Sequence, residues 1–216
     1  MSARSEILQR VRAGVGKADF AGRWARLESL LVEPVRGPQA LISGDLVARF
    51  QEKASSLSSS VERVLDPQAA PAAVARFLAA GRLGNRVVLT ADLAGLDWLA
   101  SALEVAVRPA EDADQVGVSG CFCAIAETGT LMLLSGASSP ATVSLLPETH
   151  VALVPESRIV ATMEDAFALL RAERGSVPRA INFISGPSRT GDIEQTIVLG
   201  AHGPCRVHLI LTGEKS

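Results

Sequence analysis

The chain has 216 residues, of which 48% are hydrophobic, so it is long enough to bury a substantial core within one domain. Its 21 basic and 23 acidic residues are scattered and give a net charge of −2, which excludes an electrostatic surface for nucleic acid or anionic lipid. No stretch has the length and apolarity of a membrane span or a signal peptide, so a cytoplasmic location is expected.

The predicted elements begin with a short helical arm. Apolar residues at helical spacing predict a helix over residues 3–13, and a glycine-rich break follows it. Residues 1–40 are therefore assigned to an N-terminal helical arm, and residues 41–216 to a larger domain. Within that domain, the first predicted helix covers residues 45–57.

From residue 61 onward, predicted strands alternate with predicted helices, and this alternation is typical of parallel pairing. The predicted strands are residues 61–65, 86–90, 150–154, 180–184 and 206–211. The predicted helices are residues 71–80, a stretch from Asp92 with Leu96, Leu99 and Leu103 on one face, residues 163–174, and residues 191–199. A capping-box variant at Thr162 supports the third of these helices. The expected fold is an α/β protein with a mostly parallel sheet.

The middle of the chain departs from this rhythm. Residues 121–126 and 130–134 are apolar runs joined by a short turn that contains Gly129, so they predict an antiparallel β-hairpin inserted on the parallel sheet. Cys121 and Cys123 are either metal ligands or buried core thiols. Core thiols are favoured because no further ligands converge on them, and no metal site is predicted.

Several enzyme classes lack their central residues here. The sequence has no convincing G-x-S-x-G elbow, few lysines for a Schiff base or a P-loop, and no G-x-G-x-x-G dinucleotide motif after a predicted strand. Three cysteines are also too few for a four-cysteine iron–sulfur cluster, so no cofactor is expected in this chain.

Two polar clusters remain as candidate sites. The first, Glu127-Thr128-Gly129-Thr130, places a carboxylate beside backbone N–H groups at the hairpin turn, where it acts as a base or nucleophile or is simply an exposed turn. The second, residues 184–194, carries hydroxyls and Arg189 between a predicted strand and a predicted helix. Such a turn binds a small carboxylate or phosphate, or it is an ordinary helix cap.

Arg189 favours the ligand-binding interpretation of the second cluster. A cation near the positive end of a helix is unfavourable unless an anion is bound there. His202, in the turn before the last predicted strand, is either an acid or base or a solvent-facing side chain. The candidate catalytic residues are Glu127, Asp192 and His202. The candidate substrate-binding residues are Thr128, Gly129, Thr130, Ser185, Gly186, Ser188, Arg189, Thr190 and Glu194.

The motifs resemble those of the lactate-utilisation protein C family, whose shared module is the LUD domain. The resemblance covers roughly residues 40 to 212 and is specific because several motifs occur together. They are the runs 120–131 (GCFCAIAETGTL), 146–150 (LPETH), 182–190 (NFISGPSRT), 192–194 (DIE) and 199–204 (LGAHGP).

The resemblance implies a doubly wound sheet like that of ribose-phosphate isomerases and CoA-transferases, with both polar clusters at the carboxyl ends of strands. It also implies a subunit of a system that oxidises L-lactate to pyruvate, with iron–sulfur clusters in companion proteins. Two alternatives stay open: a stand-alone enzyme acting on an acyl-CoA or a sugar phosphate, and a non-catalytic assembly or regulatory subunit.

Overall fold

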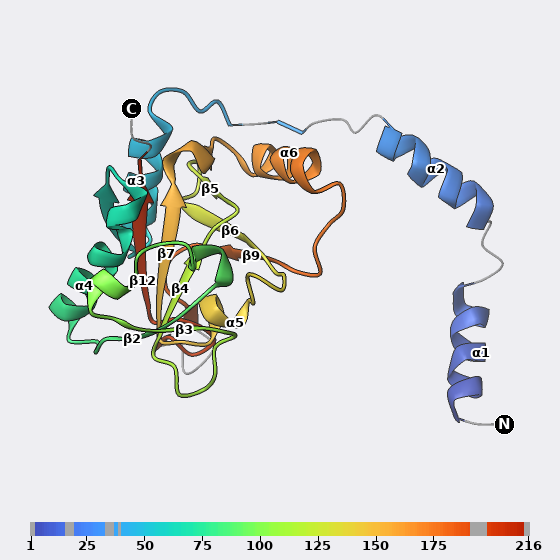
Figure 1. Ribbon diagram of the computed structural model, residues 1–216. Helices are drawn as coiled ribbons and strands as arrows, with labels where there is room; N and C mark the ends of the chain where they lie inside the picture. Colours follow the sequence, from blue (N-terminus) through green and yellow to red (C-terminus); the bar gives the residue numbers. More distant parts are fainter. Residues whose placement is uncertain (1–2, 16–19, 33–36, 39, 191–197, 214–216) are drawn as a thin grey trace. The chain divides into compact units, whose positions relative to one another are not determined.

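Two units make up the chain, residues 1–39 and 40–216, and the computed structural model describes residues 3–15, 20–32, 37–38, 40–190 and 198–213. The first unit holds α1 (Ala3–Val15) and α2 (Phe20–Val32) (Figure 1). The predicted helix over residues 3–13 corresponds to α1. The second helix is not predicted because Gly22 reads as a breaker, although one glycine costs a helix only about 1 kcal/mol. Among the described helices, none combines the length and apolarity that crossing a membrane requires.

The larger unit is built on a six-stranded parallel sheet with the strand order β1-β12-β7-β4-β2-β3. Its strands are β1 (Ser60–Val64), β2 (Arg86–Leu89), β3 (Glu104–Val107), β4 (Val116–Gly120), β7 (Thr149–Pro155) and β12 (Arg206–Thr212). Figure 1 shows β12 and β7 side by side in the middle of this unit. The prediction of an α/β fold with a mostly parallel sheet is confirmed.

A second sheet of four strands has the order β8-β5-β6-β9. Its strands are β5 (Cys123–Ile125), β6 (Thr130–Leu134), β8 (Ile159–Val160) and β9 (Ile181–Ile184). The antiparallel hairpin is confirmed as β5 and β6, with Gly129 at φ +66° in its turn. The strand predicted over residues 180–184 is also present, but it pairs antiparallel with β6 instead of joining the parallel sheet. Periodicity identified the strand and carried no information about its partner.

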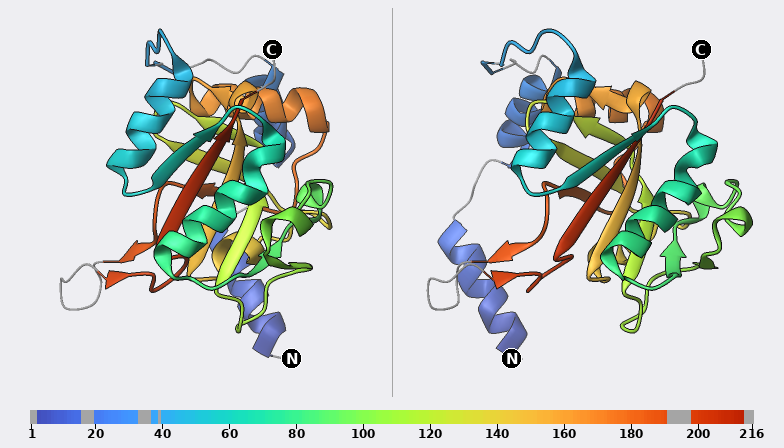
Figure 2. Two further views of the ribbon diagram at one scale, coloured as in Figure 1. Left: turned by 60° about the vertical axis from the view of Figure 1, so that its left-hand side comes forward. Right: turned by 90° about the vertical axis from the view of Figure 1, so that its left-hand side faces the viewer.

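Different layers cover the two faces of the parallel sheet. The helices of this unit are α3 (Leu46–Ser56), α4 (Ala70–Gly81), α5 (Thr142–Leu145) and α6 (Met163–Arg174), with 3₁₀ turns η1 (Pro67–Ala69), η2 (Ala91–Leu93), η3 (Leu99–Ser101) and η4 (Glu156–Arg158). Figure 2 shows α4 lying on one face of the sheet. There Val74 and Leu78 of α4 pack with Ile210 of β12 in one core. On the other, α3 and the second sheet pack against Leu209 and Leu211. The second sheet thus takes the place of a helical layer.

The predicted helix that begins at Asp92 is wrong. The chain there forms the separate 3₁₀ turns η2 and η3, and Leu99, expected on the buried face, is 95% exposed. The indole N–H of Trp98 donates to the carbonyl of Leu93, the last residue of η2, at 2.9 Å. Gly95 between them further disfavours a continuous helix.

The predicted helix over residues 191–199 is also contradicted at its end. Arg189–Thr190 (β10) and Val198–Leu199 (β11) pair as a short antiparallel ribbon, while residues 191–197 lie outside the described part of the chain. The capping box at Thr162 is confirmed: its hydroxyl accepts from the N–H of Asp165, whose carboxylate accepts from the N–H of Thr162.

Two histidines are buried in the parallel sheet. His150 lies on β7, where Nε2 contacts the Ser119 hydroxyl at 2.8 Å, and burial lowers its pKa to about 4. His208 lies on β12 and stacks on Phe77 of α4 with ring centroids 3.9 Å apart. Burial lowers its pKa to about 4 as well, against the opposing effect of Glu62. Both imidazoles are therefore neutral at neutral pH.

Replacing His150 with glutamine should make the free energy of unfolding less sensitive to acid. In the unfolded chain a histidine has a pKa of about 6.5, so that state takes up the proton first and stability falls as the pH drops from about 6.5 to about 4. Below about pH 4 the histidine is protonated in both the folded and the unfolded state, so the free energy of unfolding falls no further on its account. Linkage predicts a loss of roughly 2 kcal/mol between about pH 7 and about pH 4.5 for one such histidine. Chemical denaturation at several pH values measures it.

His202→Gln is the matched control, because His202 is exposed. This variant should keep the wild-type dependence on pH, whereas His150→Gln should flatten it. Identical pH dependence in wild type and His150→Gln would contradict the prediction.

Candidate functional site

The order of the parallel strands creates a crevice between β4 and β2. The next strand of this sheet after β2 is β3, at the outer edge, whereas the next strand of this sheet after β4 is β7, on the other side. In open parallel sheets, ligands bind outside the carboxyl ends of the strands at this reversal of direction. The residues that follow Leu89 and Gly120 therefore form the expected ligand crevice.

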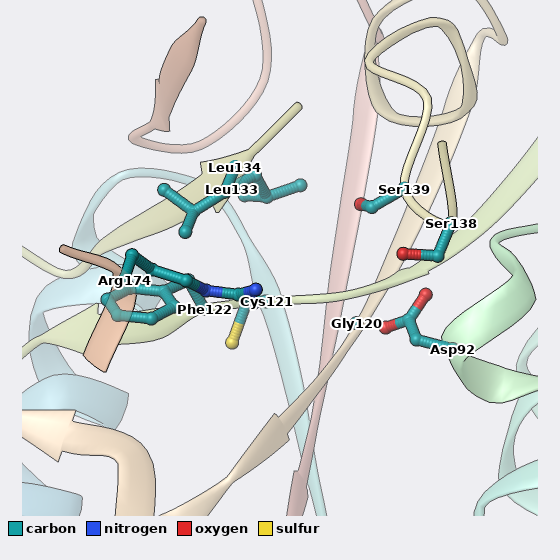
Figure 3. Close-up of a pocket in the computed structure, with 9 residues that line it drawn as sticks. All are labelled: Asp92, Gly120, Cys121, Phe122, Leu133, Leu134, Ser138, Ser139 and Arg174. Atoms are coloured by element: carbon teal, nitrogen blue, oxygen red, sulfur yellow. The ribbon is translucent and has the colours of Figure 1, made fainter. Parts of the chain in front are cut away.

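A cavity of about 110 Å³ lies at this point. Its lining residues come from η2, from the end of β4 and the residues after it, from β6, from the loop after β6 and from the end of α6: Asp92, Gly120, Cys121, Phe122, Leu133, Leu134, Ser138, Ser139 and Arg174. A second hollow of about 320 Å³ shares Ser138, Ser139 and Arg174 with it. Figure 3 shows Asp92 and Ser138 facing each other, with Arg174 extending toward them from the opposite side.

Gly120 allows Asp92 to approach the floor of the crevice. A Cβ atom at Gly120 would lie 2.4 Å from Oδ2 of Asp92, closer than any real contact. The N–H of Gly120 donates to the hydroxyl of buried Thr90 at 3.4 Å, and the N–H of Ala91 donates to the carbonyl of Ser138 at 2.8 Å. These bonds connect the ends of β2 and β4 to the loop of residues Ser135–Ser139 after β6, called the serine loop below.

Arg158 holds the opposite wall of the crevice. Its Nε donates to the carbonyl of Phe122 at 2.8 Å, and its guanidinium lies 4.8 Å from the centre of the Phe122 ring. Nη2 of Arg158 donates to Glu173 at 3.0 Å, and this ion pair lowers the pKa of Glu173. Because Glu173 precedes Arg174, one side chain connects the β4–β5 segment to the end of α6.

The two cysteines next to the crevice are poor nucleophiles. Burial, with a smaller contribution from Cys123, raises the pKa of the Cys121 thiol far above its ordinary value. Burial raises the pKa of Cys123 to about 11, partly offset by Arg158. Cys123 is fully buried, so the prediction of a core thiol is confirmed for it, whereas Cys121 is half-buried. Within the described residues, no cluster of three or more histidine, cysteine or acidic side chains has the geometry of a metal site.

The polar groups of the crevice suit a small carboxylate that also carries a hydroxyl group. A guanidinium binds a carboxylate in bidentate fashion, and serine hydroxyls add donors. Asp92 offers an acceptor for a hydroxyl proton on the other side of the same cavity.

The structure brings part of the predicted site together elsewhere. The Thr128 hydroxyl donates to the Thr130 hydroxyl at 2.8 Å, and Thr130 contacts the Ser185 hydroxyl at 2.7 Å. Glu127 is half-buried, and its N–H donates to the carbonyl of Ala161. The two predicted clusters therefore meet through a chain of hydroxyl groups.

Both predicted clusters pack against the C-terminal end of α3. A Cβ at Gly129 would lie 2.5 Å from the backbone nitrogen of Ala54, and one at Gly186 would lie 2.3 Å from the carbonyl oxygen of Leu57. Both glycines also have positive φ, so glycine is required at each position on two grounds.

Arg189 has partners at the same helix end. Its guanidinium donates to the carbonyl of Leu57 at 3.3 Å and to the hydroxyl of Ser58. A cation at a helix C-terminus interacts favourably with the helix dipole, so this contact accounts for the arginine without a bound anion. The assignment of Arg189, Ser185, Gly186, Ser188 and Thr190 to ligand binding stays a prediction.

The expectation that these clusters lie at the carboxyl ends of the parallel strands is wrong. Ser188 donates its N–H to the carbonyl of Pro204, two residues before β12 begins, and Ser58 lies two residues before β1. The clusters are therefore at the amino ends of these strands. His202 is exposed in the same region, beside a hollow that Leu146, Glu148 and Cys205 also line. Asp192 and Glu194 lie outside the described residues.

Sequence reasoning missed most residues of the crevice. The sequence pattern places Asp92 at the start of one predicted helix and Arg174 at the end of another. The run from Ser135 to Ser139 is recognisable as a donor-rich loop after a strand, but it is equally compatible with a plain connection. The missing information was the strand order, which decides which loops face one another.

Comparison with known proteins places the chain in a family. The family model described as the LUD domain matches residues 47–212. "Lactate utilization protein C" of Bacillus subtilis (strain 168) is 39% identical over 122 residues, which cover 55% of this chain and 50% of that protein. The protein of the same name from Geobacillus sp. (strain WCH70) is 40% identical over 121 residues, with the same coverage. The chain thus spans about half the length of the curated relatives that it matches.

A solved structure supports the same assignment. The crystal structure of a DUF162 family protein from Deinococcus radiodurans is similar, with a TM-score of 0.59 and 25% sequence identity. The similarity covers 81% of this chain and all of that one. Since the family model matches more than half of the sequence, the chain belongs to the LUD domain family.

Proposed function

We propose that this chain is a subunit of a system that oxidises L-lactate to pyruvate, and that it binds a small carboxylate in the crevice between β2 and β4. The names of its relatives support the pathway. The observation that carries the ligand proposal is the placement of Arg174, Asp92 and the serine loop around one cavity at the reversal point of the sheet.

The chemistry of lactate fits these side chains. Arg174 pairs with the carboxylate, and Ser138 and Ser139 donate to it, while Asp92 accepts the proton of the adjacent hydroxyl. Oxidation of lactate to pyruvate releases two electrons and two protons. The hydroxyl proton passes to Asp92, the proton of the hydroxyl-bearing carbon leaves to solvent, and the two electrons pass to iron–sulfur clusters, which we propose lie in companion proteins.

The amino-acid composition supports this proposed division of labour. Three cysteines do not supply the four thiolates of a typical iron–sulfur cluster, so a cluster belongs to a companion chain. All three are free thiols, which suits the reducing cytoplasm that we propose as the site of action.

Arg174→Ala should abolish stabilisation of the protein by L-lactate or pyruvate. A ligand at ten times its dissociation constant stabilises the native state by about 1.4 kcal/mol, which corresponds to a rise in Tm of roughly 3–6 °C for a protein of this size. A thermal-shift screen of lactate, pyruvate, inorganic phosphate, sugar phosphates and CoA measures this. Arg171→Ala, one helical turn away, is the matched control and should respond like the wild type.

The same screen distinguishes the two candidate sites. Arg189→Ala should lower the basal Tm, because the α3 end loses its cation, and should keep the lactate-dependent shift. A shift that survives Arg174→Ala but disappears in Arg189→Ala would move the ligand to the predicted Ser185–Thr190 site and overturn the crevice assignment.

Gly120→Ala should weaken ligand binding with little loss of stability. The added methyl group displaces the flexible Asp92 carboxylate, and moving a side chain costs less than moving backbone. Isothermal titration with L-lactate measures the affinity, for which we expect a loss of roughly tenfold or more, in line with the cost of misplacing one polar group. Gly95→Ala, where a Cβ meets open space, should leave affinity unchanged, and equal affinities in both variants would contradict the role of Asp92.

Lactate oxidation by the reconstituted companion proteins should require this chain. Pyruvate formation should be lost when the chain is omitted, restored by wild type and not restored by Arg174→Ala. An unchanged rate without the chain, or turnover of an acyl-CoA by the purified chain alone, would contradict the proposed role.

A further inference from the structure

β3 is an edge strand of the parallel sheet, and among the described strands its partner is β2. Edge strands offer unpaired backbone groups to other chains, so proteins commonly protect them with charges, bulges or a covering segment. β3 is short, and charged residues occur at both ends of its run, Glu104 and Arg108. Whether these charges block or favour pairing with another strand depends on which backbone N–H and C=O groups of β3 face the free edge.

The hydrogen-bonding phase of β3 identifies the outward groups. The N–H of Glu104 donates to the carbonyl of Asn85 on the β2 side at 2.8 Å. Because backbone groups alternate in direction along a strand, Ala106 also faces β2, and the N–H and C=O groups of Val105 and Val107 face the free edge.

We propose that β3 pairs antiparallel with β3 of a second copy of this chain, about a two-fold axis that passes between the two Ala106 residues. In this register Val105 of one copy lies opposite Val107 of the other, and such a pair exchanges both N–H···O=C bonds. The same register places Glu104 opposite Arg108 of the second copy.

Charge complementarity selects this occupant and this register. Opposite charges directly across an antiparallel pair are stabilising, whereas like charges there are destabilising. The run from Glu104 to Arg108 has a negative charge at its first residue and a positive charge at its last. Antiparallel self-pairing therefore brings opposite charges together at both ends. An edge strand protected against self-pairing would carry charges of one sign at these positions, so that like charges would lie opposite each other in the pair.

The present partners of these residues leave them able to pair across the edge. Glu104 contacts Arg86 at 3.0 Å, but both side chains are well exposed, so this pair adds little and is easily shared. Arg108 is fixed by a bidentate contact with Asp114 at 2.7 and 2.9 Å, and its Nη1 also donates to the carbonyl of Pro109. These bonds leave its Nε–H as the donor for Glu104 of the second copy. The arginine is therefore positioned in advance.

The predicted dimer is weak. β3 contributes four residues, far less than the surface of a standard stable interface, which is roughly 800 Å² for each partner. Val107, which is exposed, adds apolar area within the strand itself. Self-association should consequently depend on protein concentration.

Disulfide trapping tests the register. In an antiparallel pair of this phase, the two Ala106 residues form a non-hydrogen-bonded pair with a Cα–Cα distance of about 4.5 Å, within the range that a disulfide spans. In a Cys205→Ser background, Ala106→Cys should give a reducible covalent dimer on mild oxidation. Ala80→Cys, at an exposed position on α4, is the control and should stay monomeric on a non-reducing gel.

A charge-swap series measured by size-exclusion chromatography with light scattering tests the pairing chemistry. The wild type should shift from monomer to dimer mass with increasing concentration. Glu104→Arg and Arg108→Glu should each lose the dimer, and the double variant should regain it, because its cross-copy pairs are again of opposite sign. Glu52→Arg reverses an exposed carboxylate on α3, outside the pairing register, and should dimerise like the wild type.

The double variant distinguishes pairing between copies from effects within one chain, because it restores neither the Glu104–Arg86 nor the Arg108–Asp114 contact. Wild-type protein that stays monomeric at every concentration would overturn the proposal. So would a dimer that tolerates both single reversals, or Ala106→Cys protein that forms no more covalent dimer than Ala80→Cys.

Discussion

The need to cover both faces of the parallel sheet governs the rest of this molecule. β12 and β7 lie in the middle of that sheet, and their side chains alternate between two cores, so neither face of these strands meets solvent. The chain covers one face with α4 and the other with α3 and a second sheet. The second sheet is in turn covered by α6, whose Ala166 and Leu170 pack on the hairpin. The ends of these covering layers supply the walls of the crevice.

The sequence was sufficient to predict most elements of this fold and not their partners. Strands β1, β2, β7 and β12, the hairpin and helices α3, α4 and α6 have clear local signals, because burial imposes regular periodicity and caps mark their ends. β4 and β8 were not predicted, since a glycine-containing run and a two-residue strand give little periodic signal. β9 was predicted and placed in the wrong sheet, because strand pairing is a long-range property that local pattern does not contain.

The candidate site shows the same difference between local sequence signals, which were recognised, and long-range contacts, which were not. The Glu127–Thr130 and Ser185–Thr190 motifs are visible because each is a continuous run of unusual residues, and they do meet in space. Their glycines and Arg189 pack on the end of α3, so a conspicuous motif can record a close approach of backbones as readily as a ligand. The crevice is assembled from one to three residues on each of five segments, and only the strand order brings Asp92, Ser138 and Arg174 around one cavity.

The passage from Gly120 to Phe122 has a mechanical consequence. Here the chain leaves the parallel sheet at the end of β4 and enters the second sheet at β5, so the floor of the crevice is also a covalent joint between the two sheets. A molecule seated on that joint touches both layers, and its occupancy resists their sliding past each other. Amide hydrogens in β4 and in β5 would then exchange more slowly together, which links the filling of a small cavity to the rigidity of the whole domain.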